Sequence, residues 1–455
     1  MAERIAVIGS GYVGTIVAGC LASIGHEVVG LEIDKAKRER LERGLAPFFE
    51  SGADDLLRAG LETGRLRFTG DTADAVCSSD VIFLCVGTPP TECGHADIGA
   101  LEAAARSVAR AMTDPKVLVV KSTVPIGSAR WLEAVIEDAL PPERAGLQFS
   151  VVSNPEFLRQ GSSVEDYLHP DRIVLGSDDP MALELVTDIY RPILDQDLDG
   201  RETGKLRPTL FRTGLTTAET VKYASNAFLA LKISFANEIA NIAELVDADV
   251  GDVTDALGLD RRIGRPFLDA GAGWGGSCFG KDLGELITTA HEHGYSAPLL
   301  RATVEVNRCQ RALIVRKLRH RLRGLRGRRI GLLGLAFKPG TDDLRDAPAI
   351  DIARALLDGG ARVCGHDPAV GVVHEVPELN LVEDPYAVAE RADAVVLMTE
   401  WPAYRDLELD LIGSRMRGRL LVDGRNVFDR EKVEIAGLVY EGIGRPGSSL
   451  GASAP

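Results

Sequence analysis

A cysteine within a glycine-rich stretch is the residue of this sequence best suited to covalent chemistry. Residues 271–282 read Gly-Ala-Gly-Trp-Gly-Gly-Ser-Cys-Phe-Gly-Lys-Asp, so four glycines precede Cys278 and a lysine-aspartate pair follows it. Glycine permits close backbone approach and a left-handed conformation. An apolar helical pattern begins at Leu283, which predicts that Cys278 lies on a loop just before a helix N-terminus, where the helix dipole favours a thiolate. The alternative is an ordinary buried cysteine beside a turn.

A dinucleotide fingerprint opens the chain. An apolar strand runs into Gly9-x-Gly11-x-x-Gly14, an apolar helix follows, and a second strand ends at Glu32. This order of elements is typical of a Rossmann nucleotide site. A carboxylate at that strand end can accept hydrogen bonds from both ribose hydroxyls and would repel a 2′-phosphate, so the pattern favours NAD over NADP. A strand-turn-helix unit without a nucleotide is the alternative.

Three further buried strands end in polar residues. Thr88 and Thr123 each follow an apolar strand, and Glu156 follows the next one. Ligands of open parallel sheets bind beyond the carboxyl ends of the strands, so both threonines are expected to face the cofactor. Each could instead cap the following helix. Glu156 is a candidate general base. The polar residues 195–214 then read as a linker.

The longest helical pattern of the chain extends from about residue 216 to residue 246. It places Lys222 and Asn226 one turn apart on one face, with an apolar stripe along the remainder. A helix of this length usually bridges domains or forms a dimer seam. The alternative for the two polar residues is a solvated helix face.

A second series of strands and helices begins near residue 328 and lacks the glycine fingerprint. Phe337-Lys338-Pro339 stands in its place, where a lysine suits a phosphate or a sugar hydroxyl. The basic residues 316–329 read as a helix end and an exposed linker. The expected fold is therefore α/β, with two Rossmann-like doubly wound domains joined by a long central helix. The expected domains are an NAD-binding domain (1–205), a central helical domain with the cysteine loop (206–325), a second Rossmann-like domain (326–445) and a flexible tail (446–455).

Composition narrows the class of protein. The 455 residues carry a formal net charge of −15, which argues against a nucleic-acid partner. No segment resembles a signal peptide or reaches transmembrane length, so no membrane association is expected. The seven cysteines are odd in number and include no CxxC pair, which predicts neither a disulfide framework nor a metal site. A reducing cytoplasmic location is expected.

Taken together, the motifs closely resemble the UDP-glucose 6-dehydrogenases, within the wider UDP-glucose/GDP-mannose dehydrogenase family. The resemblance covers the chain up to about residue 440. The matching motifs are Gly9-Ser-Gly-Tyr-Val-Gly14, Gly87-Thr-Pro89, Lys121-Ser-Thr-Val-Pro125, Asn154-Pro-Glu-Phe-Leu158, Lys222 with Asn226, Arg262-Ile-Gly264, Gly275-Gly-Ser-Cys-Phe279 with Lys281-Asp282, and Phe337-Lys-Pro339.

The resemblance implies a four-electron oxidation, in which UDP-glucose, two NAD⁺ and water give UDP-glucuronate and two NADH. Cys278 would trap the aldehyde as a thiohemiacetal, and a second oxidation would leave a thioester for hydrolysis. By the same resemblance, Lys222 and Asn226 stabilise oxyanions, Asp282 with Thr123 orients the water, and Glu156 is the acid or base of hydrolysis.

The resemblance also implies binding residues and an assembly. The residues implied for NAD are Gly9, Gly11, Tyr12, Val13, Gly14, Glu32, Thr88 and Thr123. The residues implied for the nucleotide sugar are Phe157, Leu158, Lys222, Arg262, Phe267, Leu268, Gly275, Lys338 and Arg425, with Arg262 reaching the substrate of a neighbouring subunit. A homodimer or an assembly of dimers is expected, with no metal.

Two departures from the family pattern leave room for another substrate. Gln160 stands where members commonly have a second glutamate, so a proton-transfer role there would shift to Glu156. Gly280 replaces a usual proline or glutamine and is expected to loosen the loop. The alternative substrates are dTDP-glucose and GDP-mannose. A two-electron dehydrogenase with a Lys/His acid-base would not need Cys278, and a non-catalytic nucleotide-binding Rossmann protein would need only the glycines.

Overall fold

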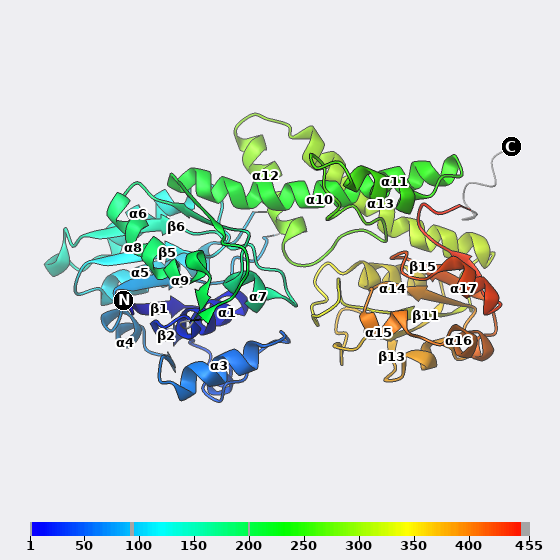
Figure 1. The fold of residues 1–455 in the computed structure, drawn as a ribbon, viewed down its shortest axis with the longest axis horizontal. Helices are drawn as coiled ribbons and strands as arrows, with labels where there is room; N and C mark the ends of the chain where they lie inside the picture. Colours follow the sequence, from blue (N-terminus) through cyan, green and yellow to red (C-terminus); the bar gives the residue numbers. More distant parts are fainter. Residues whose placement is uncertain (1, 92–94, 199–200, 447–455) are drawn as a thin grey trace. The chain divides into compact units, whose positions relative to one another are not determined.

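The structure is a computed structural model that describes residues 2–91, 95–198 and 201–446 (Figure 1). The chain divides into two compact units, Met1–Ser225 and Asn226–Pro455. The predicted tail lies almost wholly outside the described residues. Within the part of the chain that the structure describes, no helix is long and apolar enough to cross a membrane.

The first unit is built on an eight-stranded sheet in the order β10-β7-β6-β5-β4-β1-β2-β3. The six strands from β3 to β6 pair in parallel and follow the 3-2-1-4-5-6 order of doubly wound nucleotide folds. β7 pairs antiparallel with β6. The strands are β1 (Arg4–Ile8), β2 (Glu27–Leu31), β3 (Leu66–Thr69), β4 (Val81–Leu84), β5 (Lys116–Val120), β6 (Phe149–Ser153), β7 (Arg172–Gly176) and β10 (Thr209–Thr213).

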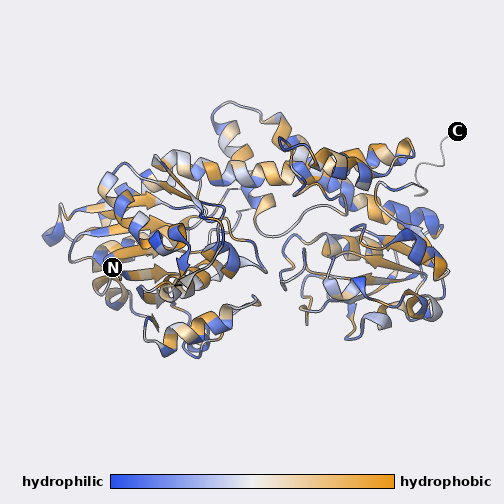
Figure 2. Cartoon of the chain, viewed as in Figure 1, coloured by the Kyte–Doolittle hydropathy of each residue, from blue (hydrophilic) through white to orange (hydrophobic). Residues whose placement is uncertain are grey.

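The central strands of this sheet are apolar along their length because helices cover both faces (Figure 2). Every residue of β4 is fully buried, at 0% exposure. The helices are α1 (Tyr12–Ser23), α2 (Lys35–Leu41), α3 (Ala53–Glu62), α4 (Thr72–Cys77), α5 (Gly99–Ala111), α6 (Ser128–Ala139), α7 (Ser163–Leu168), α8 (Pro180–Ile189) and α9 (Arg191–Asp195).

The glycine fingerprint is required by the turn between β1 and α1. Gly9 has a φ of 92°, a left-handed conformation that favours glycine. A Cβ on Gly14 would lie 1.9 Å from the carbonyl oxygen of Gly9, so only glycine lets the helix pack this closely on the turn. The turn therefore has the geometry that the spacing predicts.

The prediction of a linker over residues 195–214 is wrong. These residues form a small hairpin of β8 (Asp197–Leu198) and β9 (Arg201–Glu202), followed by β10, which pairs in parallel with β7. β10 is the edge strand of the sheet and is largely exposed. Its sequence is polar because an edge strand keeps solvent contact, which removes the apolar signal of a buried strand.

The predicted long helix is confirmed as α10, Leu215–Leu245, and it spans the sequence boundary between the two units. The second unit continues with α11 (Val250–Gly258), α12 (Phe279–Glu292) and α13 (Pro298–Arg321). α10, α12 and the Trp274 loop share a small buried cluster that includes Ala230 and Leu283.

The second sheet has six parallel strands in the order β13-β12-β11-β14-β15-β16, which is again 3-2-1-4-5-6. The expectation of two doubly wound Rossmann-like halves is therefore confirmed. Its elements are β11 (Arg329–Leu333), α14 (Pro348–Asp358), β12 (Arg362–His366), β13 (Asn380–Leu381), β14 (Ala394–Leu397), α15 (Pro402–Arg405), α16 (Leu409–Arg415), β15 (Leu420–Asp423), α17 (Arg430–Ile435) and β16 (Val439–Glu441).

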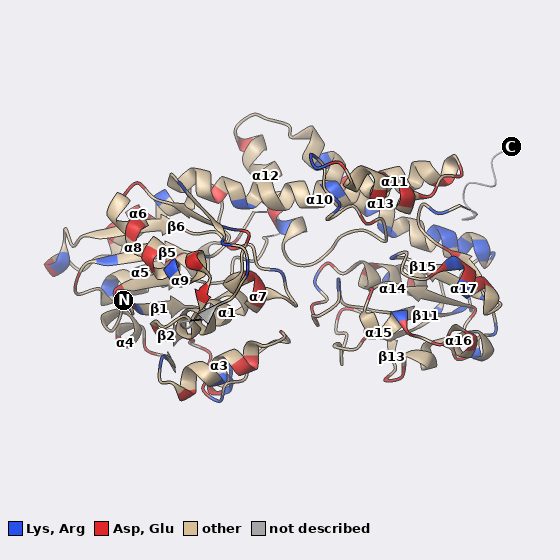
Figure 3. Ribbon diagram, in the orientation of Figure 1, with Lys and Arg blue, Asp and Glu red and all other residues tan. Residues whose placement is uncertain are grey.

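Charged residues are mostly scattered over the helices and loops of each unit (Figure 3), but Lys317 is an exception. Its side chain is fully buried, and its Nζ lies 2.8 Å from Glu244 Oε1 and 3.0 Å from Glu441 Oε1. Arg321 also pairs with Glu441, at 2.8 Å. The reading of residues 316–329 as an exposed basic face is therefore wrong at Lys317, which links α10, α13 and β16.

Replacing Lys317 by methionine should destabilise the protein by about 3–5 kcal/mol, because it leaves two buried carboxylates without their shared cation. Urea unfolding followed by circular dichroism measures the change. The neighbouring Arg316→Met is the matched control, since Arg316 is exposed, and it should shift the free energy by less than about 0.5 kcal/mol. Equal effects of the two substitutions would contradict a stabilising role of the buried cluster.

Candidate active site

Cys278 is the N-cap residue of α12. The helix therefore begins at Phe279, four residues earlier than predicted, and Lys281 and Asp282 lie in its first turn. The backbone N–H of Asp282 donates to the carbonyl oxygen of Cys278 at 2.8 Å. The sequence did not predict this first turn because Gly280 disfavours helix. Gly280 was expected to loosen the loop, but it lies in the helix and not in the loop. A Cβ at Gly280 would lie 3.3 Å from Asp346 Oδ2.

The glycines of residues 271–276 allow the loop to pack against the protein itself. Gly273 has a φ of 103°, and a Cβ there would lie 2.5 Å from Asn307 Oδ1. A Cβ on Gly275 would lie 2.2 Å from the carbonyl oxygen of Asp346. Both distances are far below normal contact. The loop that leads to Cys278 is therefore held by tight packing within the second unit.

Buried side-chain amides anchor the same loop. Asn307 binds Trp274 at two points, accepting from its N–H at 2.8 Å and donating to its carbonyl oxygen at 3.0 Å. Gly271 donates to Asn237 at 2.8 Å and accepts from Gln310 at 2.9 Å. Sequence reasoning missed these three amides. Their signal was a polar residue on an otherwise apolar helix face, on α10 for Asn237 and on α13 for the other two.

Lys222 and Glu156 form a buried ion pair in the first unit. Lys222 Nζ donates to Glu156 Oε1 and to the Glu156 carbonyl oxygen, both at 2.7 Å. The two side chains are only 5% and 8% exposed, so the solvated-face alternative for Lys222 is wrong. Two cations lie over the Phe157 ring, with the Arg172 guanidinium 4.2 Å and Lys222 Nζ 5.6 Å from its centre. The backbone N–H of Leu158 donates to Glu156 Oε2 at 2.7 Å.

The environment of Glu156 favours its ionised form. Burial alone would raise the pKa of this carboxyl, but the charge and hydrogen bond of Lys222 and the Leu158 N–H outweigh burial. The resulting pKa lies below the ordinary value for glutamate. Glu156 is therefore a carboxylate at neutral pH, paired with Lys222.

Asn226 and Asp282 form a buried hydrogen bond in the second unit, and Asn226 is one helical turn after Lys222 on α10. Asn226 Nδ2 donates to Asp282 Oδ2 at 2.6 Å, and Lys281 Nζ lies 3.6 Å from Asp282 Oδ1. Asp282 is fully buried and Asn226 is 8% exposed. This contact joins the middle of α10 to the first turn of the helix that Cys278 caps.

The residues predicted for the cofactor lie at the carboxyl edge of the first sheet. Thr88 Oγ1 donates to the carbonyl oxygen of Thr123 at 2.7 Å, so the structure brings the two threonine turns together. Glu32 is buried and follows β2, where its Oε1 accepts from the Asp34 N–H at 2.9 Å. Lys37 Nζ lies 3.6 Å from Glu32 Oε2. Glu32 is thus positioned at the strand end, as predicted, with Lys37 beside its carboxylate and Arg38 donating to its carbonyl oxygen at 2.9 Å.

Arg425 contacts the cysteine loop from the second sheet. Its guanidinium donates to the carbonyl oxygens of Met398 at 2.8 Å, Gly273 at 3.1 Å and Phe337 at 3.4 Å. Lys338 Nζ lies 5.6 Å from the centre of the Phe337 ring. The structure therefore groups Arg425 and Lys338, both predicted to bind the nucleotide sugar, with the glycine loop that contains the predicted Gly275.

Three other residues of the second unit were predicted to bind the nucleotide sugar, namely Arg262, Phe267 and Leu268. Arg262 has an 89% exposed side chain and pairs with Asp260 at 2.6 Å on the surface of its unit. Phe267 adopts a φ of 67°, a left-handed conformation that is unusual for an aromatic residue. Leu268 is buried at 2% exposure. Its N–H already donates to the carbonyl oxygen of Arg265.

Arg345 is a cation beside Cys278 that sequence reasoning missed. The Asp343 carboxylate holds the pKa of Arg345 above its ordinary value, and the Cys278 sulfur adds to this effect. The Gly276 N–H also donates to the Arg345 carbonyl oxygen at 3.1 Å. Positive charge near a cysteine favours its thiolate. The only sequence signal was the arginine in Thr341-Asp-Asp-Leu-Arg345, far from the cysteine along the chain.

Comparison with known proteins identifies the family. A model for the NAD binding domain of the UDP-glucose/GDP-mannose dehydrogenase family matches residues 3–194, and its central and UDP binding domains match residues 216–309 and 331–430. The chain belongs to this family. It is an oxidoreductase, and the match to the NAD binding domain confirms the cofactor predicted from the fingerprint.

Individual relatives support the same assignment. The chain is 45% identical to a UDP-glucose 6-dehydrogenase of Rhizobium meliloti, over 97% of this chain and 100% of that protein. A UDP-glucose dehydrogenase structure from Pyrobaculum islandicum aligns with a TM-score of 0.87 and 40% identity, covering 98% of each chain. A UDP-D-ManNAc dehydrogenase from Pyrococcus horikoshii aligns at 0.84 with 29% identity, covering 97% of this chain and 99% of that one.

Replacing Lys222 by methionine should reverse the pH dependence that Glu156 contributes to stability. In the native protein the lowered pKa of Glu156 stabilises the fold at pH values above the pKa that Glu156 has in the unfolded chain. This contribution is lost as the pH falls through the pKa of Glu156 in the folded protein. Without Lys222, burial dominates and raises the pKa of Glu156. The substitution should therefore cost about 3–5 kcal/mol near neutral pH and clearly less near about pH 4.

Urea unfolding at a series of pH values measures this difference. Lys232→Met is the matched control on the same helix, because Lys232 Nζ contacts only the carbonyl oxygens of Ile263 and Gly264 among its hydrogen-bond partners in the described chain. Its cost should be small and constant with pH. A pH-independent cost of Lys222→Met would contradict the buried pair.

Proposed function

We propose that this dehydrogenase oxidises the 6-hydroxyl of UDP-glucose to a carboxylate, using two NAD⁺ and one water for each sugar. The observation that carries the proposal is the position of Cys278 at the N-cap of α12, beside a buried Asp282 that binds Asn226. A two-electron alcohol dehydrogenase with a Lys/His acid-base would not need this thiol. The UDP-glucose 6-dehydrogenases among the relatives favour UDP-glucose over dTDP-glucose and GDP-mannose.

The first sheet supplies a fitting NAD site. The Gly9 turn and the close packing at Gly14 support binding of the pyrophosphate at the N-terminus of α1, and buried Glu32 at the end of β2 would accept hydrogen bonds from the ribose hydroxyls. Gly9, Gly11, Tyr12, Val13, Gly14, Glu32, Thr88 and Thr123 are proposed to hold the cofactor. Bound NAD⁺ accepts one hydride in each of the two oxidations.

Cys278 allows the second oxidation to proceed through a covalent adduct. Its thiolate adds to the carbonyl carbon of the aldehyde formed in the first oxidation, giving a thiohemiacetal alkoxide. Loss of a hydride from that carbon leaves a thioester. Water then adds to the thioester, the carbon–sulfur bond breaks, and the carboxylate and thiolate are released with two protons. The helix N-terminus and Arg345 favour the thiolate at both ends of this sequence.

Four polar groups assist the proton and charge changes. Lys222 Nζ and Asn226 Nδ2 are hydrogen-bond donors for the alkoxide and for the oxyanion of hydrolysis. Glu156, ionised by its low pKa, accepts a proton from the attacking water. Asp282 with Thr123 is proposed to orient that water.

The substrate residues and domains follow from the same proposal. Phe157, Leu158, Lys222, Arg262, Phe267, Leu268, Gly275, Lys338 and Arg425 are proposed to bind the nucleotide sugar. Residues 1–205 are proposed as the NAD-binding domain, 206–325 as the central domain and 326–445 as the nucleotide-sugar domain. A need for NAD and a reduced Cys278 fits a cytoplasmic enzyme.

A homodimer is proposed from one exposed apolar row on α10. Phe228, Phe235 and Ile242 recur every seven residues and are 62%, 46% and 50% exposed, and Leu245 adds a fourth at 73%. A heptad row of exposed apolar residues is typical of a helix seam between subunits. Two copies of α10 would cover each other's row.

Purified protein should form two NADH for each UDP-glucose consumed, because the aldehyde stays on the enzyme until it is oxidised again. Absorbance of NADH against product quantified by chromatography gives the ratio. Initial rates with UDP-glucose, dTDP-glucose and GDP-mannose should rank UDP-glucose first, and Cys278→Ala should abolish net turnover. The exposed Cys309→Ala is the matched control and should retain activity. A ratio of one, or full activity in Cys278→Ala, would overturn the four-electron proposal.

Phe235→Asp should convert the dimer to a monomer, because a carboxylate in the seam would be desolvated without a partner. Sedimentation velocity at micromolar concentration distinguishes the two masses. Met181→Asp, which also replaces an exposed apolar residue but on α8, should leave the dimer intact. A wild-type protein that sediments as a monomer would refute the seam.

A further inference from the structure

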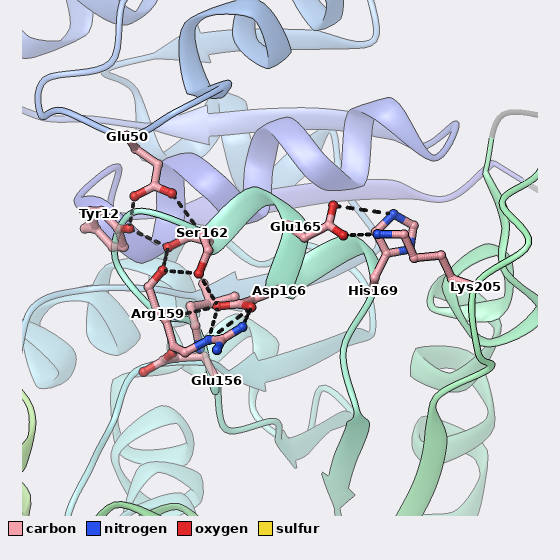
Figure 4. Close-up of polar contacts among 11 residues, drawn as sticks. Tyr12, Glu50, Glu156, Arg159, Ser162, Glu165, Asp166, His169 and Lys205 are labelled. Carbon is pink, nitrogen blue, oxygen red and sulfur yellow. Dashed lines mark hydrogen bonds and ion pairs between the residues drawn. The ribbon is translucent and has the colours of Figure 1, made fainter. Parts of the chain in front are cut away.

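A buried carboxylate joins the cofactor fingerprint to the segment that carries Glu156 (Figure 4). Glu50 is 7% exposed and comes from the turn that precedes α3, so it belongs to neither segment. Its Oε2 accepts from the hydroxyl of Tyr12, the residue that begins α1. The same Oε2 accepts from the Gly161 N–H at 2.6 Å, and Oε1 accepts from the Ser163 N–H at 2.8 Å.

Additional contacts strengthen the junction. Ser163 Oγ contacts the Tyr12 hydroxyl and lies 2.9 Å from the carbonyl oxygen of Arg159, and its single O–H donates to one of these two oxygens. Ser163 is fully buried. The Tyr12 ring packs on Phe48 with the ring centres 4.6 Å apart, which limits the rotation of the tyrosine. The hydroxyl of Tyr12 is thus held on two sides within the first unit.

Residues 156–163 are consequently fixed at both ends. At one end Glu156 binds Lys222, and at the other end Gly161 and Ser163 bind Glu50. Phe157, Leu158 and Gln160 lie between these anchors. The Glu50 carboxylate accepts hydrogen bonds both from Tyr12 and from residues 161 and 163. Movement of Tyr12 should therefore shift this carboxylate and the backbone that it holds, because hydrogen bonds to a buried carboxylate are strong and costly to leave unmade.

We propose that Glu50 is a positioning residue, which couples the cofactor loop at Tyr12 to the substrate segment 156–163. The inference rests on the proposed function for the identity of the two ligands, but the coupling itself is a property of the first unit. Glu50 touches no reacting atom. It acts by keeping Tyr12 and the backbone of residues 161–163 in one arrangement, so that each ligand binds to a segment already shaped for the other.

The test uses three variants of the full chain. Glu50→Gln keeps the side chain's size but presents an amide N–H₂ to backbone donors. Tyr12→Phe removes only the hydroxyl and should not disturb folding. The third variant combines them. Initial rates give KM for NAD and for UDP-glucose, and each single variant should raise both KM values by about tenfold. The double variant should resemble the larger single effect, because both substitutions break one junction.

Glu219→Gln is the matched control. Glu219 is also a buried glutamate that accepts from two backbone N–H groups, those of Gly127 and Ala129, at 2.6 and 2.8 Å. The Glu219→Gln variant should lower the melting temperature as Glu50→Gln does. Its KM for NAD and its KM for UDP-glucose should each stay within about twofold of the wild-type value. Equal KM changes in the control, or multiplicative effects in the double variant, would overturn the coupling.

Hydrogen exchange separates this inference from the proposed function. Saturating NADH, without any sugar, should slow amide exchange of residues 159–168 in the wild type and in Glu219→Gln. It should not do so in Glu50→Gln or Tyr12→Phe. Wild-type protein that is inactive on UDP-glucose yet shows this pattern would refute the substrate and support the coupling. Protection by NADH that persists in Glu50→Gln would refute the coupling whatever the substrate.

Discussion

The two carboxylates of the proposed mechanism, Glu156 and Asp282, are buried, and a buried carboxylate must find a cation or hydrogen-bond donors. Helix α10 supplies both partners, Lys222 for Glu156 and Asn226 for Asp282. A buried carboxylate without such a partner would take up a proton or destabilise the packing of the segment that carries it. Lys222 and Asn226 are one turn apart on this helix, and each makes its contact within its own unit.

The surroundings of Cys278 follow from a second constraint, the tight packing of its loop. Gly273 and Gly275 lie against Asn307 and Asp346 at distances that no other residue could adopt. This packing fixes the thiol at the N-cap of α12 with Arg345 nearby. The protein therefore places the proposed nucleophile through its own backbone before any substrate arrives, which would limit the entropy lost on reaction.

Much of the fold could be predicted because its signals are local. The fingerprint at Gly9, the helix over α10 and the second strand series each follow from spacing and apolar runs. The edge strand β10 was mistaken for a linker because it is exposed and polar. Lys317 was mistaken for a surface residue because its carboxylate partners lie far along the chain. The start of α12 was misplaced because Gly280 interrupts the helical pattern.

The site was predictable in its residue types and less so in its contacts. Cys278, Lys222 and Glu156 stood out by chemistry, yet the amide clamp from Asn307, the cation Arg345 and the Glu50 junction did not. Each depends on residues brought together only by the fold, and a single asparagine or arginine carries no local signal.

Formation of a covalent adduct on Cys278 during turnover can be measured directly, by peptide mass spectrometry after acid quench of enzyme that is turning over UDP-glucose with NAD⁺. We expect the peptide with Cys278 to gain the mass of a UDP-glucuronyl group through its sulfur. An unmodified Cys278 peptide while NADH is accumulating, or the adduct on another residue, would contradict this expectation.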